Sequence, residues 1–398
     1  IQDAVKECFY HLRTGRPRPV EIEIPPETLS DVTEVGSYAS EELPIESIDG
    51  SSIEEAAGLL VSSSNPVIWA GGGVNLSDAS TELLSLAEYL QIPVLTTAEG
   101  KGSISDKHYL SLGTPQGRST GESKDELRDF FNKCDVILAI GTRFNTANPS
   151  DSQKVIQIDI DPEEIGRNNN NTVGIVGDAK RGVEQLLFAV KSMTEPRVSR
   201  KEELEKIVFN RTNNPKTRIE PQASFVEALR EGIPEDGIVV TDMTIMAYYA
   251  RAHFPTYHPR SYFTSSYTGN LGSGYPTALG VKVAKPDKPV ISISGDGGFL
   301  FNSQELSTAV QFGINVVAVV FNDGAYGNVK RDMKNLFDNK SLGVELVNPD
   351  FMKLADAYGV IGMRADTPDG LKQCLQQAVS MEKPVLIEVP IGEMPSPF

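Results

Sequence analysis

Two aspartates, Asp296 and Asp323, each follow a short apolar segment that is rich in β-branched residues. These segments, residues 289–294 and 315–321, are typical of buried parallel strands. The carboxyl ends of neighbouring parallel strands lie at one edge of a sheet, and this is where ligands bind. Mg²⁺ takes one or two protein carboxylates and leaves its other positions to phosphate oxygens and water. The spacing therefore predicts a site for a diphosphate that is held through a divalent cation.

Glycines surround the first of these aspartates. Gly295, Gly297 and Gly298 flank Asp296, and apolar residues at helical spacing predict a helix over about residues 302–312. Glycine lets the backbone approach an anion closely, and a helix N-terminus adds N–H donors. The plain alternative is a turn between a strand and a helix, followed by a surface turn after the second strand. The order of the two motifs favours the cofactor site.

This stretch resembles the signature of thiamine diphosphate enzymes, in particular the acetolactate synthase-like branch of 2-oxo acid decarboxylases and carboligases. The resemblance implies that Asp296 and Asp323 are side-chain ligands of Mg²⁺, that Ala325 is a backbone-carbonyl ligand and that Gly327 lies beside the cofactor. Asp323 stands where the family commonly has asparagine, so it adds a negative charge near the diphosphate. The implied reaction is decarboxylation of a 2-oxo acid, followed by release of an aldehyde or by carboligation to a carbonyl acceptor.

A glycine-rich stretch at residues 267–280 resembles the family's turn that leads into a small-residue helix. By this resemblance, the carbonyl of Gly269 accepts a hydrogen bond from the aminopyrimidine of the cofactor, and Leu271 supports the bent cofactor. Taken alone, the stretch is equally consistent with a loop that packs a helix tightly on the sheet. Its place before the Asp296 motif favours thiamine diphosphate.

Strand and helix patterns alternate along most of the chain. They predict an α/β fold with doubly wound parallel sheets in two consecutive domains. Near the start, we expect residues 4–12 to be helical and residues 14–25 to form a turn and a strand. With the resemblance, the expected organisation is a C-terminal remnant of a pyrimidine-binding domain (1–29), a linker (30–52), a central α/β domain (53–192), a second linker (193–219) and a diphosphate- and Mg-binding domain (220–398).

The catalytic residue is not identified on this chain. In the family, the pyrimidine-binding domain contributes a glutamate that protonates the pyrimidine ring, and no residue here is assigned that role. The sequence starts at Ile1 without an initiator methionine, so we expect a domain to be missing upstream. Two alternative functions stay open: a non-catalytic cofactor-binding or regulatory subunit, or fragment, that needs a separate pyrimidine domain, and a metal-dependent phosphate-ester enzyme.

The central region has two further glycine-containing motifs. Residues 71–73 are three glycines that we interpret as a tight turn rather than a nucleotide cradle. Residues 141–144 resemble the flavin-side sequence of relatives that carry FAD, but residues 145–147 replace the acidic residues expected next, and residues 113–117 are only loosely similar. FAD therefore has little support, and Arg143 is interpreted as an ion-pair partner.

Composition limits the classes of partner. The chain has 398 residues and a formal net charge of −17, and we find neither basic patches for nucleic acid nor an apolar run long enough to span a membrane. Three cysteines far apart in the sequence indicate neither a disulfide framework nor a zinc site, and buried thiols in a reducing cytoplasm are expected. The resemblance adds a homodimer or homotetramer, because the family builds each site between two subunits, and a small 2-oxo acid as substrate.

Overall fold

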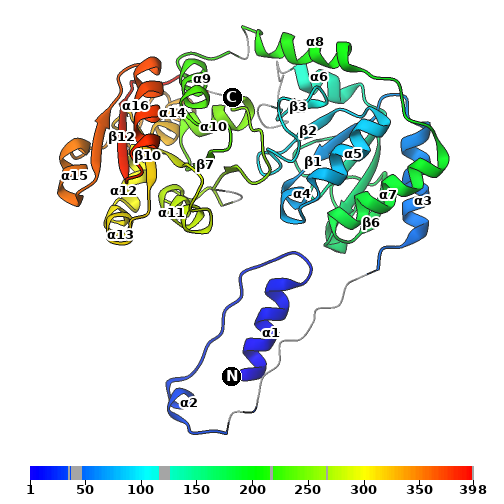
Figure 1. Cartoon of the computed structure of the whole chain (residues 1–398), viewed down its shortest axis with the longest axis horizontal. Helices are drawn as coiled ribbons and strands as arrows, with labels where there is room; N and C mark the ends of the chain where they lie inside the picture. Colours follow the sequence, from blue (N-terminus) through cyan, green and yellow to red (C-terminus); the bar gives the residue numbers. More distant parts are fainter. Residues whose placement is uncertain (35, 37–46, 116–125, 216–217, 266–267, 397–398) are drawn as a thin grey trace.

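Two parallel β-sheets dominate the computed structural model, which describes residues 1–34, 36, 47–115, 126–215, 218–265 and 268–396. Within these residues each sheet has six strands, and all of the strand pairs are parallel. The two sheets lie side by side, and each is surrounded by its own helices (Figure 1). The predicted α/β class with doubly wound parallel sheets in consecutive parts of the chain is confirmed.

The first sheet has the strand order β3-β2-β1-β4-β5-β6. Strands β2 and β3 are added on one side of β1, and strands β4 to β6 are added on the other. The pair β1 and β4 therefore marks a topological switch point. Every residue of β1 and β4 is buried, as expected for central strands covered on both faces. The strands are β1 (Val67–Ala70), β2 (Val94–Thr96), β3 (Ser111–Gly113), β4 (Val136–Ile140), β5 (Lys154–Asp159) and β6 (Thr172–Val176).

Helices of this part pack their apolar faces into a single core with the sheet. Asp49 caps helix α3 by accepting a hydrogen bond from the Ser51 N–H. The charged helix after the sheet, α8, is largely exposed, but it buries Leu204 completely. The helices are α3 (Gly50–Ser62), α4 (Gly72–Leu76), α5 (Ser80–Leu90), α6 (Glu126–Asn132), α7 (Ala179–Met193) and α8 (Lys201–Thr212).

The second sheet has the order β11-β12-β10-β9-β7-β8, with its switch point between β7 and β9. Apolar residues alternate between two cores, one on each face of the sheet. The strands are β7 (Ile238–Thr241), β8 (Tyr262–Phe263), β9 (Val290–Gly295), β10 (Val316–Asn322), β11 (Ile361–Arg364) and β12 (Val385–Pro390). The helices are α9 (Gln222–Gly232), α10 (Ile245–His253), α11 (Gly274–Ala284), α12 (Asp296–Phe301), α13 (Glu305–Phe312), α14 (Gly327–Leu336), α15 (Phe351–Tyr358) and α16 (Pro368–Ser380).

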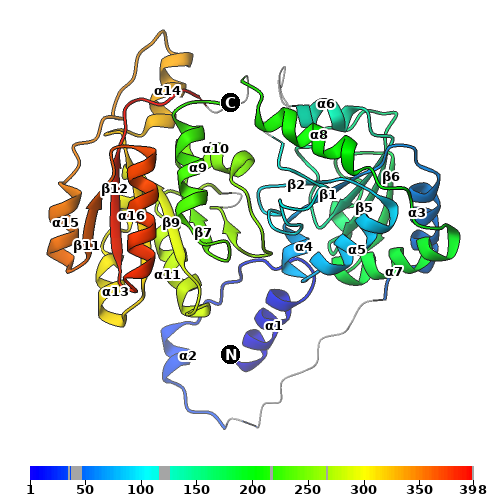
Figure 2. The ribbon, with the colours of Figure 1, turned by 45° about the horizontal axis from the view of Figure 1, so that its top comes forward.

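The first thirty residues contribute no strand to either sheet, and their two helices lie outside the two sheet-containing parts (Figure 2). The expected helix is present as α1 (Gln2–Arg13), and a short α2 (Pro26–Ser30) follows it. The strand expected within residues 14–25 is wrong: these residues do not join a strand ladder. A strand needs a partner backbone for its hydrogen bonds. Residues 14–25 pair with neither of the two sheets.

Other expectations concern single residue types. No helix formed by the described residues is both long and apolar enough to cross a bilayer. The three cysteines are free, but only Cys134 is buried, because Cys8 and Cys374 lie in partly exposed helices. His253 stacks on Tyr249, and burial lowers its pKa to about 3, which favours a structural role.

Candidate active site

The two predicted metal ligands lie next to each other at the carboxyl ends of adjacent strands. Gly295 at the end of β9 is level with Phe321 of β10, so Asp296 and the residues after Phe321 emerge at the same edge. Asp296 is buried with 2% of its surface exposed, whereas Asp323 is partly buried. The β-branched strands position both carboxylates, since parallel pairing fixes their common edge. The juxtaposition predicted from the sequence is present.

Backbone and side-chain donors hold these carboxylates. Asp296 Oδ2 accepts hydrogen bonds from the N–H of Gly324 at 3.0 Å and from Asn348 Nδ2 at 2.6 Å. Asp323 Oδ1 accepts one from the N–H of Ala325 at 3.2 Å. Burial, followed by the negative charge of Asp296, raises the pKa of Asp323 to about 6. A cation between the two would relieve this repulsion, so the pair fits a hard divalent metal.

Ala325 lies opposite Glu345 in an isolated antiparallel bridge. Its two hydrogen bonds run from the Tyr326 N–H to the Val344 carbonyl and from the Leu346 N–H to the Gly324 carbonyl. The bridge therefore does not use the Ala325 carbonyl, which stays a candidate ligand. Among the described residues, no group of three or more histidine, cysteine, aspartate or glutamate side chains could hold a metal. A cation here would need oxygens from its ligand, as a diphosphate supplies.

The glycines of the motif have close side-chain neighbours. A Cβ on Gly297 would lie 2.6 Å from the Tyr326 ring, and one on Gly298 would lie 3.2 Å from Asp242 Oδ2. A Cβ on Gly295 would lie 3.2 Å from Thr244 Oγ1. Packing thus gives a reason for these glycines that does not involve a phosphate. The helix predicted over about residues 302–312 is α13, which begins at Glu305, and an additional helix that was not predicted, α12, begins at Asp296.

Gly327 is the first residue of α14 and lies next to the Asp323 side chain. A Cβ at this position would clash with Asp323 Oδ2. Glycine at this position therefore leaves room for the Asp323 carboxylate. The resemblance assigned Gly327 to the cofactor, and the structure adds a close approach to Asp323, one of the two predicted metal ligands.

The second motif lies beside the end of β7. Gly269 has φ of +61°, which favours glycine, and Leu271 keeps 37% of its surface exposed. Asp242, which sequence reasoning missed, is completely buried after β7 and accepts hydrogen bonds from the N–H groups of Gly272 at 2.9 Å and Gly274 at 3.3 Å. Burial raises the pKa of Asp242, although its backbone hydrogen bonds act in the opposite direction. Asp242 thereby fixes the turn that presents Gly269 and Leu271.

Asn348 is a second residue of the candidate site that sequence reasoning missed. It precedes α15, and its Nδ2 also donates to Asn322 Oδ1 at 2.8 Å. Asn322 in turn donates from Nδ2 to Glu388 Oε1 at 2.8 Å, and Glu388 pairs with Arg364 at 2.7 Å. No local spacing connects Asn348 or Glu388 with the motif, so only the fold reveals them.

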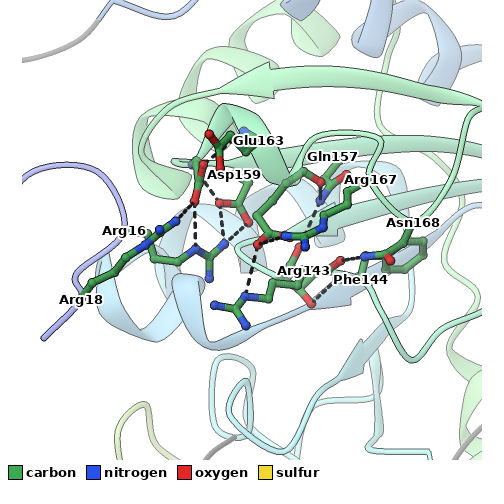
Figure 3. A network of polar contacts seen from close by, with 12 residues as sticks. Arg16, Arg18, Arg143, Phe144, Gln157, Asp159, Glu163, Arg167 and Asn168 are labelled. Carbon is green, nitrogen blue, oxygen red and sulfur yellow. Dashed lines mark hydrogen bonds and ion pairs between the residues drawn. The ribbon is translucent and has the colours of Figure 1, made fainter.

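The glycines of the first sheet serve close packing. A Cβ on Gly73 would lie 2.5 Å from the Gly141 Cα, and the Gly73 N–H donates to the Gly141 carbonyl at 2.9 Å. Gly71 alone separates β1 from α4, which begins at Gly72, so the chain turns sharply from strand to helix here, as interpreted from the sequence. Arg143 forms an ion pair with Glu164 at 3.4 Å, as interpreted from the sequence (Figure 3). Residues 116 and 117 of the loosely flavin-like stretch lie outside the described residues.

Figure 3 also shows how the N-terminal segment contacts this sheet. Arg16 Nη2 donates to both carboxylate oxygens of Asp159 at 2.9 Å, and Arg18 Nη2 donates to Asp161 Oδ2 at 2.7 Å. Asp159 ends β5 and is 2% exposed. Burial raises the pKa of Asp159, while the charge of Arg16 lowers it. These ion pairs attach residues 16–18 to the first sheet.

Comparison with known proteins covers both sheets. A family model described as the thiamine pyrophosphate enzyme central domain matches residues 53–186, and one described as the C-terminal TPP binding domain of the same enzymes matches residues 242–389. The second match contains both aspartates and the Gly269 turn. The fold and the site thus define a thiamine diphosphate enzyme.

Similarity to individual proteins narrows the class. The chain is 37% identical to a probable acetolactate synthase large subunit of Methanocaldococcus jannaschii, over 98% of this chain and 69% of the relative. It is 31% identical to the acetolactate synthase large subunit of Haemophilus influenzae and 32% identical to that of Lactococcus lactis, over 99% of this chain and 71% and 70% of those relatives. The chain belongs to the thiamine diphosphate enzymes, in the branch of the acetolactate synthase large subunits. It is an enzyme, and the non-catalytic alternative is not favoured.

Proposed function

We propose that this protein uses thiamine diphosphate and Mg²⁺ to decarboxylate a 2-oxo acid and to join the product to a carbonyl acceptor, as the name acetolactate synthase of its relatives suggests. The observation that carries the proposal is the pair Asp296 and Asp323 at adjacent strand ends, within the part that matches the diphosphate-binding family. Release of an aldehyde instead of carboligation is the other outcome of the same chemistry.

The chain's own residues would hold the diphosphate end of the cofactor. Asp296, Asp323 and the Ala325 carbonyl supply hard oxygens for Mg²⁺, and the metal's remaining positions suit phosphate oxygens and water. The raised pKa of Asp323 supports this assignment, because burial and the charge of Asp296 make its ionised form costly until a cation arrives. The site is thus preorganised for a doubly charged ion.

Gly269 and Leu271 would hold the ring end. Their turn is fixed by buried Asp242, so the Gly269 carbonyl and the partly exposed Leu271 side chain have defined positions. When bound, thiamine diphosphate supplies the electron sink for decarboxylation. Gly269 and Leu271 would orient the ring.

We further propose a cytoplasmic homodimer or homotetramer. Large apolar side chains are exposed on the α11–α13 side of the second sheet, with 65% of Val283, 55% of Phe301 and 68% of Phe312 accessible. Exposed apolar side chains of this size on neighbouring helices support subunit contact. Light scattering coupled to size-exclusion chromatography tests it, and a mass near 43.2 kDa would contradict it.

The function is tested by binding and by product analysis. Thiamine diphosphate should bind by calorimetry and raise the melting temperature only when Mg²⁺ is present. Incubation with a set of 2-oxo acids should then release CO₂, and NMR of the products separates carboligation from aldehyde release. Binding that is unchanged by a chelator would contradict the assigned site. Protection by simple nucleotides but not by thiamine diphosphate would instead support a phosphate-ester enzyme.

A further inference from the structure

Asn348 contacts the predicted metal-ligand carboxylate with a single amide group. Its Nδ2 lies 2.6 Å from Asp296 Oδ2 and 2.8 Å from Asn322 Oδ1, whereas its own Oδ1 is buried without a hydrogen-bond partner. The amide thus bridges two acceptors by its N–H groups. Its carbonyl oxygen gains nothing there, so folding alone does not explain an asparagine at this position.

The orientation of this amide is set from a distance. Arg364 donates to Glu388 Oε2 from Nε at 3.0 Å and from Nη2 at 2.7 Å, so Glu388 is a charged acceptor. Asn322 must therefore turn its Nδ2 toward Glu388, and its Oδ1 faces the other way. The Gly324 N–H also donates to that Oδ1, at 3.2 Å. Because Asn322 Oδ1 is an acceptor, Asn348 must present an N–H group to it. This requirement fixes the orientation of the Asn348 amide.

The consequence falls on Asp296. Its Oδ2 already accepts from the Gly324 N–H at 3.0 Å and from Asn348 at 2.6 Å. Two donors occupy that oxygen, so only Oδ1 is available to a cation. Mg²⁺ requires six near-octahedral ligands at about 2.0–2.1 Å, whereas Ca²⁺ takes 6–8 ligands and often binds both oxygens of a carboxylate.

We propose that Asn348 is a positioning residue that sets the metal preference of the site: by holding Asp296 Oδ2, it makes Asp296 a one-oxygen ligand and so favours Mg²⁺ over Ca²⁺. The inference rests on the proposed function, because it requires a cation at Asp296. It assigns to Asn348, and through it to Asn322, Glu388 and Arg364, a role in choosing the metal.

The test measures metal binding and does not depend on turnover. MgCl₂ and CaCl₂ are titrated separately into the full chain by calorimetry, at a fixed saturating concentration of thiamine diphosphate. The variants are Asn348→Leu, which keeps the size and removes the donor, and Asn348→Ala, in case leucine does not fit. Gln222→Leu is the control, since this completely buried amide donates to the Pro395 carbonyl away from the site.

We expect the ratio of Mg²⁺ to Ca²⁺ affinity to fall about tenfold or more in both Asn348 variants and to stay unchanged in Gln222→Leu. The melting temperature without metal checks that the variants fold. Equal losses of affinity for both metals, or no change for either, would overturn the inference. Neither result would contradict the proposal that Asp296 binds Mg²⁺. A wild-type protein that binds neither metal would overturn the proposed function and this inference with it.

Discussion

The carboxylates of Asp296 and Asp323 interact directly across the ends of β9 and β10. Burial raises the pKa of Asp323, and the negative charge of Asp296 raises it further, to about 6. Two ionised carboxylates in this position are unfavourable in the absence of a cation, because their negative charges repel each other. The cost of the pair in the metal-free protein and its use in the metal-bound protein can be measured separately.

Asp296→Ala should abolish metal-dependent binding of thiamine diphosphate, because the variant removes the buried carboxylate at the centre of the site. Calorimetric titration of the cofactor with Mg²⁺ present checks this. Asp287→Ala is the control, since Asp287 is an exposed residue between α11 and β9. Cofactor affinity that is unchanged in Asp296→Ala would count decisively against the assigned site.

Asp323→Asn should stabilise the metal-free protein at pH 7 but not at pH 4. A carboxyl whose pKa is raised by folding, here to about 6, favours the folded state at low pH, and this advantage is lost as the pH rises from about 4 to 6. The free energy of unfolding, measured with denaturant in the presence of a chelator, should therefore increase by about 1–3 kcal/mol at pH 7. An equal difference at both pH values would show that the effect does not come from titration of Asp323.

Leu271→Ala should weaken cofactor binding and activity by about tenfold while it leaves the melting temperature nearly unchanged. The side chain is 37% exposed, so little packing is lost in the free protein, whereas a bound cofactor ring would lose its apolar support. Leu342→Ala, at a site that is 86% exposed, is the matched control. A large loss of stability in Leu271→Ala would indicate a structural role instead.

Gly297→Ala should destabilise the protein by about 1–3 kcal/mol, because the new methyl group would lie 2.6 Å from the Tyr326 ring. Adding Tyr326→Ala should restore the free energy of unfolding, whereas Tyr326→Phe, which keeps the ring, should not. If the double variant is stable but does not bind thiamine diphosphate, Gly297 also serves the phosphate directly. Failure of Tyr326→Ala to restore stability would contradict the packing explanation.

Arg16→Ala should release the N-terminal segment more readily than Arg18→Ala does. Arg16 is 20% exposed and pairs with buried Asp159, whereas Arg18 is 61% exposed, and exposed ion pairs contribute only about 0–1 kcal/mol. Limited proteolysis should therefore cut residues 1–34 faster in Arg16→Ala. Equal cleavage rates in the two variants would assign the attachment of this segment to other contacts.

The strands that carry the site were predictable because they are short apolar runs bounded by proline or glycine. β9 and β10 lie within one residue of their predicted bounds, and parallel pairing brings Asp296 and Asp323 together. The strand expected within residues 14–25 shows the limit of this reasoning. A local pattern says that a segment can be extended, but only a partner makes it a strand.

The rest of the site depends on tertiary contacts. Asn348 reaches Asp296 across 52 positions of sequence, and Asn322 reaches Glu388 across 66. Asp242, at the end of β7, meets the glycine turn about 30 residues later in the sequence. No spacing rule connects such residues before the sheet order is known, and metal-ligand motifs describe only the groups that could touch the metal.

The contact between Arg16 and Asp159 joins positions that are 143 residues apart. Closing a flexible loop of that length costs about 4 kcal/mol of chain entropy, so the ion pair cannot lead the folding of this region. β5 must first be in place, because it presents the aspartate. The N-terminal segment is thus expected to dock late, as a separate cooperative unit, and to detach while both sheets are still folded.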